Sequence, residues 1–119
     1  MDRLLNLIVR AARLAGEQFA FANNGEELWR RLRNSLTQLL TALWADGAFD
    51  GVTPAEAFDV RCDHTTMTQA DLDAGRVIVR VEFTAAVPIE RIVAVLAMSD
   101  AGQVSLVSAQ RAGAGREAV

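Results

Sequence analysis

Hydrophobic residues recur at helical spacing in two stretches of the N-terminal part of the chain. The first stretch runs from residue 2 to about residue 18, with apolar side chains on one face and arginines on the other. The second runs from residue 25 to about residue 46, where Asn24 is placed to cap its start and Gly47 to end it. The pattern therefore predicts two amphipathic helices. Their apolar faces consist of Leu4, Leu5, Ile8, Ala11, Ala12, Ala15 and Phe19 in the first, and of Leu28, Trp29, Leu32, Leu36, Leu39, Leu40, Leu43 and Trp44 in the second.

The remaining part of the chain changes to alternation with a period of two, which is typical of strands. Single helical turns, capped by Thr53 and Thr68, are predicted before and after the first strand. One later segment is apolar on both faces, so we expect it in the centre of a sheet. The strand segments are 58–63, 76–85, the doubly apolar 89–98 and a weaker one at 103–108, and the core-facing side chains of the first two are Phe58, Val60, Cys62, Val77, Val79, Val81 and Phe83.

The predicted fold class is α+β, with two amphipathic helices packed on a small three- to four-stranded, mainly antiparallel sheet. A length of 119 residues fits one domain. We expect residues 1–98 to form that domain, and residues 99–119 to form a C-terminal arm with a strand at 103–108 and a flexible tail.

Composition narrows the function classes further. The chain contains 51% hydrophobic residues, carries a net charge of −3 and has a single cysteine. The negative charge argues against a dedicated nucleic-acid binder, and no apolar run reaches the roughly 18 residues that a membrane helix needs. A membrane-surface helix or a transit peptide is the alternative for residues 2–18, but a helix packed on the core is the expectation. Taken alone, these features predict a soluble intracellular domain.

The candidate chemistry in the sequence is sparse. Cys62 and His64 invite a nucleophilic or metal-binding interpretation, but no orienting group, oxyanion hole or further ligand accompanies them. Asp71 and Asp73, with Asp63 nearby, form an acidic cluster without the ligand pattern of a calcium loop, and helix capping explains it better. We therefore expect no enzyme activity, no metal and no cofactor.

Several motifs together resemble the C-terminal domain of contractile phage tail sheath proteins, which also occur in phage-like bacterial injection systems. The most specific part is the segment 57–76, in which an R-C-D strand is followed by a T-x-x-D-x-x-x-G-R turn. The resemblance runs from about residue 3 to residue 98. The other matching pieces are Phe19–Asn24 with Leu28 and Trp29, the helix exit from Leu43 and Trp44 to Gly47 and Ala48, and Thr53–Phe58.

The resemblance implies a structural part rather than an enzyme. Sheath subunits stack as rings around an inner tube, their C-terminal domains lie nearest that tube, and terminal arms add strands to the sheets of neighbours. The implied partners are other sheath subunits, in a homo-oligomer, and the inner tube protein, with no nucleic acid and no membrane. The implied location is the bacterial cytoplasm during assembly, and then the virion tail or a phage-like particle. Sheath proteins normally carry further domains, so we expect an isolated C-terminal domain or a small standalone relative.

The predicted sheet is too small to close on itself, so it should have open edges that a strand from another subunit can satisfy. The segment 102–108 is the candidate donated arm, with Val104, Leu106 and Ser108 facing one way. The hypothesised subunit interface comprises Val104, Leu106, Ser108, Ile92, Ala94 and Leu96. The polar helix faces are hypothesised to meet the tube or a neighbour through Arg10, Arg13, Arg30 and Arg31, and this assignment comes from polarity and not from a matched motif.

Three alternatives stay open. One is a small adaptor or cap protein of the same kind of machine. Another is a small protein-binding or regulatory domain with no sheath role, whose helices recognise a partner. The third and most distant is a cysteine enzyme that uses Cys62. Self-association at high concentration, and its dependence on residues 103–108, would separate the sheath module from the binding domain.

Overall fold

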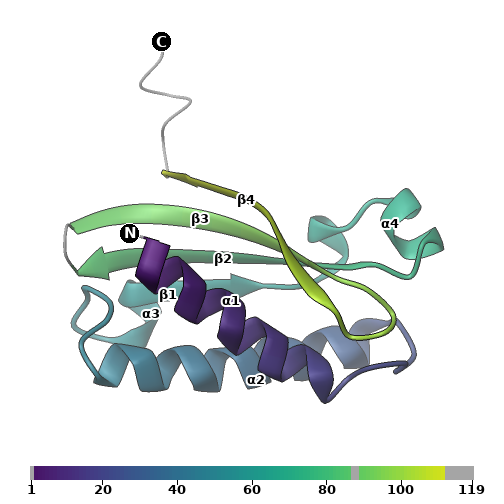
Figure 1. The fold of residues 1–119 in the computed structure, drawn as a ribbon, viewed down its shortest axis with the longest axis horizontal. Coiled ribbons are helices and arrows are strands. Elements are labelled where there is room, and N and C mark those ends of the chain that lie inside the picture. Colours follow the sequence, from purple (N-terminus) through teal and green to yellow (C-terminus); the bar gives the residue numbers. More distant parts are fainter. Residues whose placement is uncertain (1, 87–88, 112–119) are drawn as a thin grey trace, which may run out of the picture.

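Two long helices lie against one face of a four-stranded antiparallel sheet (Figure 1). The structure is a computed structural model, and it describes residues 2–86 and 89–111. The strands follow one another across the sheet in the order β1-β2-β3-β4. The α+β prediction is therefore confirmed. The elements are α1 (Asp2–Glu17), α2 (Glu26–Ala45), β1 (Phe58–Arg61), β2 (Val77–Ala86), β3 (Ile89–Met98) and β4 (Val104–Arg111).

Short helical segments connect the main elements. The first, α3 (Pro54–Ala57), begins with proline after Thr53, whose side chain accepts a hydrogen bond from the backbone of Glu56. Another, α4 (Gln69–Asp73), is capped in the same way by Thr68. Both single turns and both caps were predicted and are confirmed. Between them, a 3₁₀ turn, η1 (His64–Thr66), follows β1.

The start of α2 corrects one prediction. Gly25 and not Asn24 occupies the N-cap position, and no side chain caps this helix. The side-chain oxygen of Asn24 accepts a hydrogen bond of 2.7 Å from the indole nitrogen of Trp29 instead. A buried indole N–H needs an acceptor, and Asn24 supplies it. The predicted cap was therefore wrong because a tertiary contact competes for the same side chain.

The core lies between the helices and the inner face of the sheet. The buried hydrophobic side chains of α1 and α2 belong to the predicted apolar faces, with Val9 in addition. Alternate residues of β2 and β3 are buried, and β3 lies between β2 and β4, as its doubly apolar sequence predicted. The buried side chains of the strands are Phe58, Val60, Val77, Val79, Val81, Phe83, Ala85, Ile92, Ala94, Leu96 and Met98, and Cys62 is buried directly after β1.

The fourth strand exists but differs in detail from the expectation. It begins at Val104 and continues three residues beyond the predicted end, to Arg111. A bulge interrupts its pairing with β3, so Leu106 lies opposite Leu96 while Ser108 lies opposite Val95. Leu96 faces the core and Val95 the other face, so Ser108 points away from Val104 and Leu106. The predicted alternation was wrong at Ser108 because an extra residue in a bulge reverses the facing.

The turn between β3 and β4 is clamped to the end of α1. The backbone nitrogen of Phe21 donates a 2.6 Å hydrogen bond to the carbonyl of Asp100. Gly102 has a φ of +81°, and a Cβ there would lie 2.9 Å from the carbonyl oxygen of Gly16. A Cβ on Gly16 would lie equally close to the oxygen of Gly102. The two backbones approach so closely only because both residues lack a side chain.

Replacing Gly102 by alanine is therefore expected to destabilise the protein by about 2 kcal/mol, because it combines a left-handed backbone with a clash against rigid backbone. The measurement is the free energy of unfolding in urea. Gly25→Ala is the matched control, because no atom lies within 4 Å of its added Cβ and its φ of 176° suits any residue. Equal effects of the two substitutions would contradict the clamp.

Candidate assembly surface

The outer edge of β4 has backbone groups that no described strand pairs with. At the hairpin, the nitrogen of Ser99 donates to the carbonyl of Gln103 at 2.9 Å. Hydrogen-bonded and non-hydrogen-bonded pairs alternate along an antiparallel ladder, so the Val104 and Leu106 backbone groups point away from β3. No other described strand pairs with this edge. A segment of another chain could therefore extend the sheet here.

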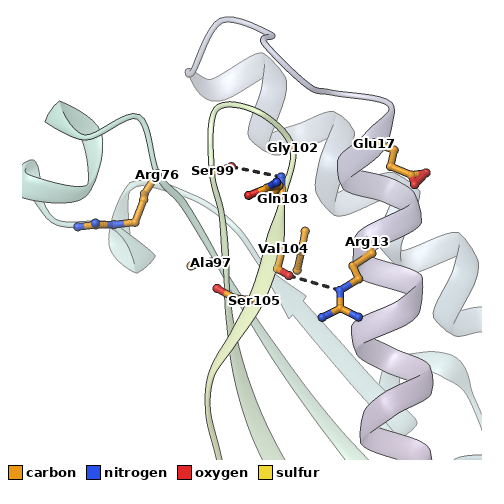
Figure 2. A pocket seen from close by; sticks show the side chains of 9 residues that line it. All are labelled: Arg13, Glu17, Arg76, Ala97, Ser99, Gly102, Gln103, Val104 and Ser105. Carbon is orange, nitrogen blue, oxygen red and sulfur yellow. Dashed lines mark hydrogen bonds between the residues drawn. The ribbon is translucent and has the colours of Figure 1, made fainter.

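One side chain reaches this edge from the helical layer. The Nε of Arg13 on α1 donates to the carbonyl oxygen of Val104 at 3.4 Å (Figure 2). A cleft of about 550 Å³ surrounds the hairpin at this point. Arg13 and Glu17 line one side of the cleft, Arg76 lines another, and the turn residues lie between them (Figure 2). The edge is thus accessible, with one arginine placed on it.

The hypothesised interface residues divide into two groups. Val104 and Ser108 are half-buried and Leu106 is 39% exposed, all on β4 at the edge of the sheet. The three on β3 have buried side chains, and β4 of the same chain already pairs with that strand. The β3 residues are therefore inaccessible while β4 is in place. They are Ile92, Ala94 and Leu96.

The opposite edge of the sheet is shorter and partly covered. The strand β1 pairs with only the middle of β2. Next to it, Phe49 forms a bridge to Ala85, and the nitrogen of Asp50 donates to the carbonyl of Thr84 at 2.9 Å. These contacts cover the C-terminal end of β2, beyond the residues that pair with β1. The longer accessible edge is that of β4.

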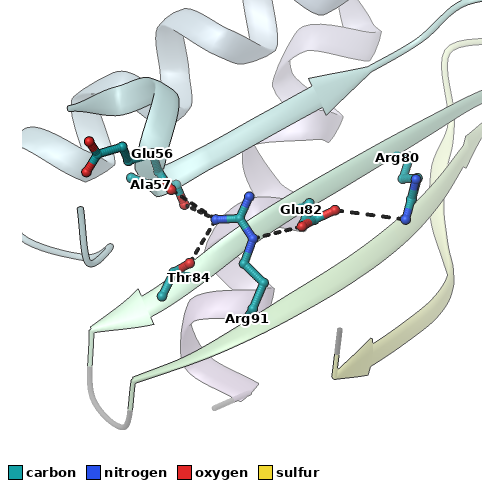
Figure 3. Close-up of polar contacts among 6 residues, drawn as sticks. All are labelled: Glu56, Ala57, Arg80, Glu82, Thr84 and Arg91. Carbon is teal, nitrogen blue, oxygen red and sulfur yellow. Dashed lines mark hydrogen bonds and ion pairs between the residues drawn. The ribbon is translucent and has the colours of Figure 1, made fainter. Parts of the chain in front are cut away.

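The outer face of the sheet is held by an arginine that the sequence analysis did not single out. The guanidinium of Arg91 reaches from β3 across β2 (Figure 3). It donates to a carboxylate oxygen of Glu82 at 2.9 Å, to the hydroxyl of Thr84 at 2.8 Å and to the carbonyl of Glu56 at 3.0 Å. One side chain thereby ties β3, β2 and α3 together. The sequence pattern does not single out Arg91, because its place opposite Thr84 depends on how β2 and β3 pair.

The four arginines hypothesised to face the tube or a neighbour all lie on the helical layer. Arg30 and Arg31 share one carboxylate, that of Glu27, at 3.7 and 3.8 Å, and all three side chains are more than half exposed. Such exposed pairs contribute little to stability. Arg10 is exposed and forms no ion pair with a described residue, while Arg13 lies on the β4 edge. Arg13 thus differs from the other three arginines because its side chain donates a hydrogen bond to a specific backbone carbonyl.

Cys62 lies in the core. Its side chain is fully buried, and burial raises the pKa of the thiol from 9.0 to about 12. A thiol that stays protonated at neutral pH is a poor nucleophile and a poor metal ligand. His64 is exposed in the 3₁₀ turn. The pair therefore lacks the activated thiolate that cysteine catalysis needs.

The acidic residues near the short helices act as caps. The side chain of Asp63 accepts from the backbone of Thr65, and the carboxylate of Asp71 accepts from the backbone of Thr68. Hydrogen bonds from Thr65 and from Thr68, respectively, lower the pKa values of these two carboxyl groups. Arg76 forms an ion pair of 3.0 Å with Asp71. The carboxylates of Asp63 and Asp71 therefore stabilise the short helical turns as caps.

Among the described residues, no three or more histidine, cysteine, aspartate or glutamate side chains gather closely enough to hold a metal ion. None of the helices in residues 2–86 and 89–111 combines the length and the apolar composition that crossing a membrane requires. The features that remain are structural: an accessible strand edge, a basic helical layer and a braced outer sheet face.

Comparison with known proteins points the same way. A family model described as the phage tail sheath C-terminal domain matches residues 2–99. The matched range covers both long helices and the first three strands, and ends at the turn before β4. A search of curated proteins finds no match.

Proposed function

Because the chain belongs to the phage tail sheath C-terminal domain family, which is a structural part of the virion tail, we propose that it joins its neighbours through the open edge of β4. In this proposal the chain is a subunit, or a domain of one, in a homo-oligomeric sheath around an inner tube protein. It assembles in the bacterial cytoplasm before it becomes part of the tail. Strand addition supplies the link between subunits, and surface contacts supply the rest.

The observation that carries the proposal is the pair of outward backbone groups at Val104 and Leu106. Main-chain hydrogen bonds are directional but largely insensitive to side chains, so a strand joint can hold while the subunits change their relative orientation. A sheath that contracts needs such a joint. The clamp between Gly16 and Gly102 supports it by fixing the edge to the helical layer.

Exchange of β4 itself is part of the same proposal. Most side chains of β4 are exposed, and Val107 at the bulge is 60% exposed, so little apolar area holds this strand in place. If β4 moves to a neighbouring subunit, the β3 backbone groups that β4 now pairs with, at Val93, Val95 and Ala97, become free to bind the neighbour's strand. The core-facing side chains of Ile92, Ala94 and Leu96 then lie beside that strand. The hypothesised interface on both strands then applies to the exchanged state.

The helical layer is the proposed contact for the tube or a neighbouring subunit. It carries Arg10, Arg30 and Arg31 on its solvent side. Arginine forms planar paired hydrogen bonds with carboxylates and is enriched at interfaces, which suits a contact with an acidic surface.

Replacing Leu106 by proline is expected to abolish self-association while leaving the fold intact. Proline removes the outward N–H that an added strand needs, but it removes no hydrogen bond to β3, and such edge positions tolerate proline. The measurement is sedimentation velocity of the full chain up to millimolar concentration, with far-ultraviolet circular dichroism to verify the fold. The wild-type chain is expected to associate as its concentration rises.

The matched control is Leu106→Ala, which removes the same side chain but keeps the N–H and should associate like the wild type. Association of the proline variant at the wild-type level would rule out this edge. A wild-type chain that stays monomeric throughout would favour the alternative, a small adaptor or protein-binding domain with no sheath role.

A further inference from the structure

We infer that Arg13 selects what is added to the β4 edge, favouring a strand from a neighbouring subunit that carries a carboxylate opposite the Arg13 guanidinium. This inference rests on the proposed strand addition and names the chemistry of the segment that the edge accepts. The structural basis is the contact between the Arg13 Nε and the outward carbonyl of Val104.

That contact occupies one of the backbone groups that an added strand would use. An incoming strand must donate its own N–H to the Val104 carbonyl and so displace the guanidinium. A neutral strand offers the displaced Arg13 no charged acceptor of its own, so only water and Glu17, four residues further along α1, remain for the guanidinium. A strand with a suitably placed carboxylate gives the guanidinium a charged acceptor, and charge-assisted hydrogen bonds are stronger than neutral ones.

The position of Arg13 is fixed by the clamp on its helix. The close backbone approach of Gly16 to Gly102 lies less than one helical turn from Arg13, and the bond from Phe21 to Asp100 lies just beyond the helix end. The helix therefore cannot move away from the hairpin without breaking these contacts. Only the Arg13 side chain is free to turn from the Val104 carbonyl towards an incoming carboxylate.

The charges around the cleft favour an acidic segment. Arg13 and Arg10 are three residues apart on α1, so they lie on the same side of the helix, and neither forms an ion pair with a described residue. Arg76 is already paired with Asp71. Glu17 is the opposing charge that lines the cleft on the α1 side. Arg10 lies outside the lining, and together with Arg13 it gives this part of α1 two arginines against one glutamate.

The selected segment is not the β4 strand of a second copy. The sequence of β4 contains no aspartate or glutamate. Two β4 edges brought together would therefore displace Arg13 on each side without offering it a carboxylate. For that reason we expect self-association of the chain alone only at high concentration, and stronger binding of an acidic strand from elsewhere in a neighbouring subunit.

The test uses short capped peptides of alternating valine and threonine with one central glutamate, glutamine or lysine. Binding to the full chain is followed by nuclear magnetic resonance titration of the backbone amides of Val104 and Leu106. The glutamate peptide is expected to bind about threefold more tightly than the glutamine peptide at low salt, and the lysine peptide more weakly than both. In the Arg13→Gln variant the preference for glutamate should disappear.

Arg3→Gln is the control, because it removes the same charge from an exposed position near the other end of α1 and should keep the preference. Equal binding of the glutamate and glutamine peptides to the wild type would overturn the selection by Arg13 but leave strand addition standing. The selection is overturned in the same way if the preference survives in Arg13→Gln or is lost in Arg3→Gln. If no peptide shifts the β4 amides, strand addition at this edge fails, and the selection fails with it.

Discussion

Replacing Phe83 by alanine is expected to lower the free energy of unfolding by about 4 kcal/mol. Phe83 is completely buried in the middle of β2. The centre of its ring lies 5.7 Å from that of Phe49, and the ring centres of Phe49 and Phe58 are also 5.7 Å apart. Phe58 lies opposite Phe83 in the pairing of β1 with β2. Removing the ring leaves a cavity in this cluster and removes the contact of Phe49 with β2. Urea unfolding followed by tryptophan fluorescence measures the effect.

The same substitution at Phe21 is the matched control. That side chain is 78% exposed, so Phe21→Ala removes almost no buried surface and should change stability by less than about 0.5 kcal/mol. Phe21 has a φ of +61°, but alanine and phenylalanine share the cost of this backbone conformation, so the comparison is fair. Losses of similar size at the two positions would show that the core has been assigned wrongly.

The elements with strong periodicity were predictable from the sequence. The apolar stripe of α2 and the alternation of β2 each extend over many residues. Only one orientation of each element towards the core therefore buries most of its apolar side chains. The central place of β3 followed from apolar residues on both of its faces. These predictions succeeded because the side chains that are apolar in the sequence are the ones that the fold buries.

Details that depend on tertiary contacts were not predictable. The side chain of Asn24 is equally suited to cap a helix and to accept from an indole, and only the folded position of Trp29 decides between them. The bulge in β4 depends on its pairing with β3, so the facing of Ser108 could not be read from alternation alone. The contact of Gly16 with Gly102 joins residues that no local pattern links.

The candidate assembly surface was predictable in kind but not in position. A small sheet must have edges, and the hydrophobic pattern placed one of them at the segment after β3. The structure adds that β4 fills the edge of β3 in the same chain, so that Val104 and Leu106 form the open edge and Leu96 lies behind it in the next strand. The special place of Arg13 among four exposed helix arginines required the fold, because it depends on where α1 crosses the hairpin.

We expect the folded protein to lose stability at alkaline pH because the thiol of Cys62 is buried. The pKa of its thiol is about 12 in the folded protein and 9.0 when unperturbed, because burial disfavours the thiolate. Above pH 9 the unfolded chain therefore releases a proton that the folded chain retains, and the folded state loses stability as pH rises towards 12. The expected loss between pH 9 and pH 11 is about 2 kcal/mol.

The composition makes this effect attributable to one residue. The sequence contains no tyrosine and no lysine, the two other side chains that titrate in this range, and arginine stays charged throughout it. Urea unfolding at pH 8 to 11 should therefore show a steep decline for the wild type and a nearly flat profile for Cys62→Ala, whose stability starts lower because of the lost side chain. Profiles of equal slope would mean that the thiol ionises as easily in the folded chain as in the unfolded one. The buried position of Cys62 in the core would then be wrong, and with it the physical reason for excluding a cysteine nucleophile.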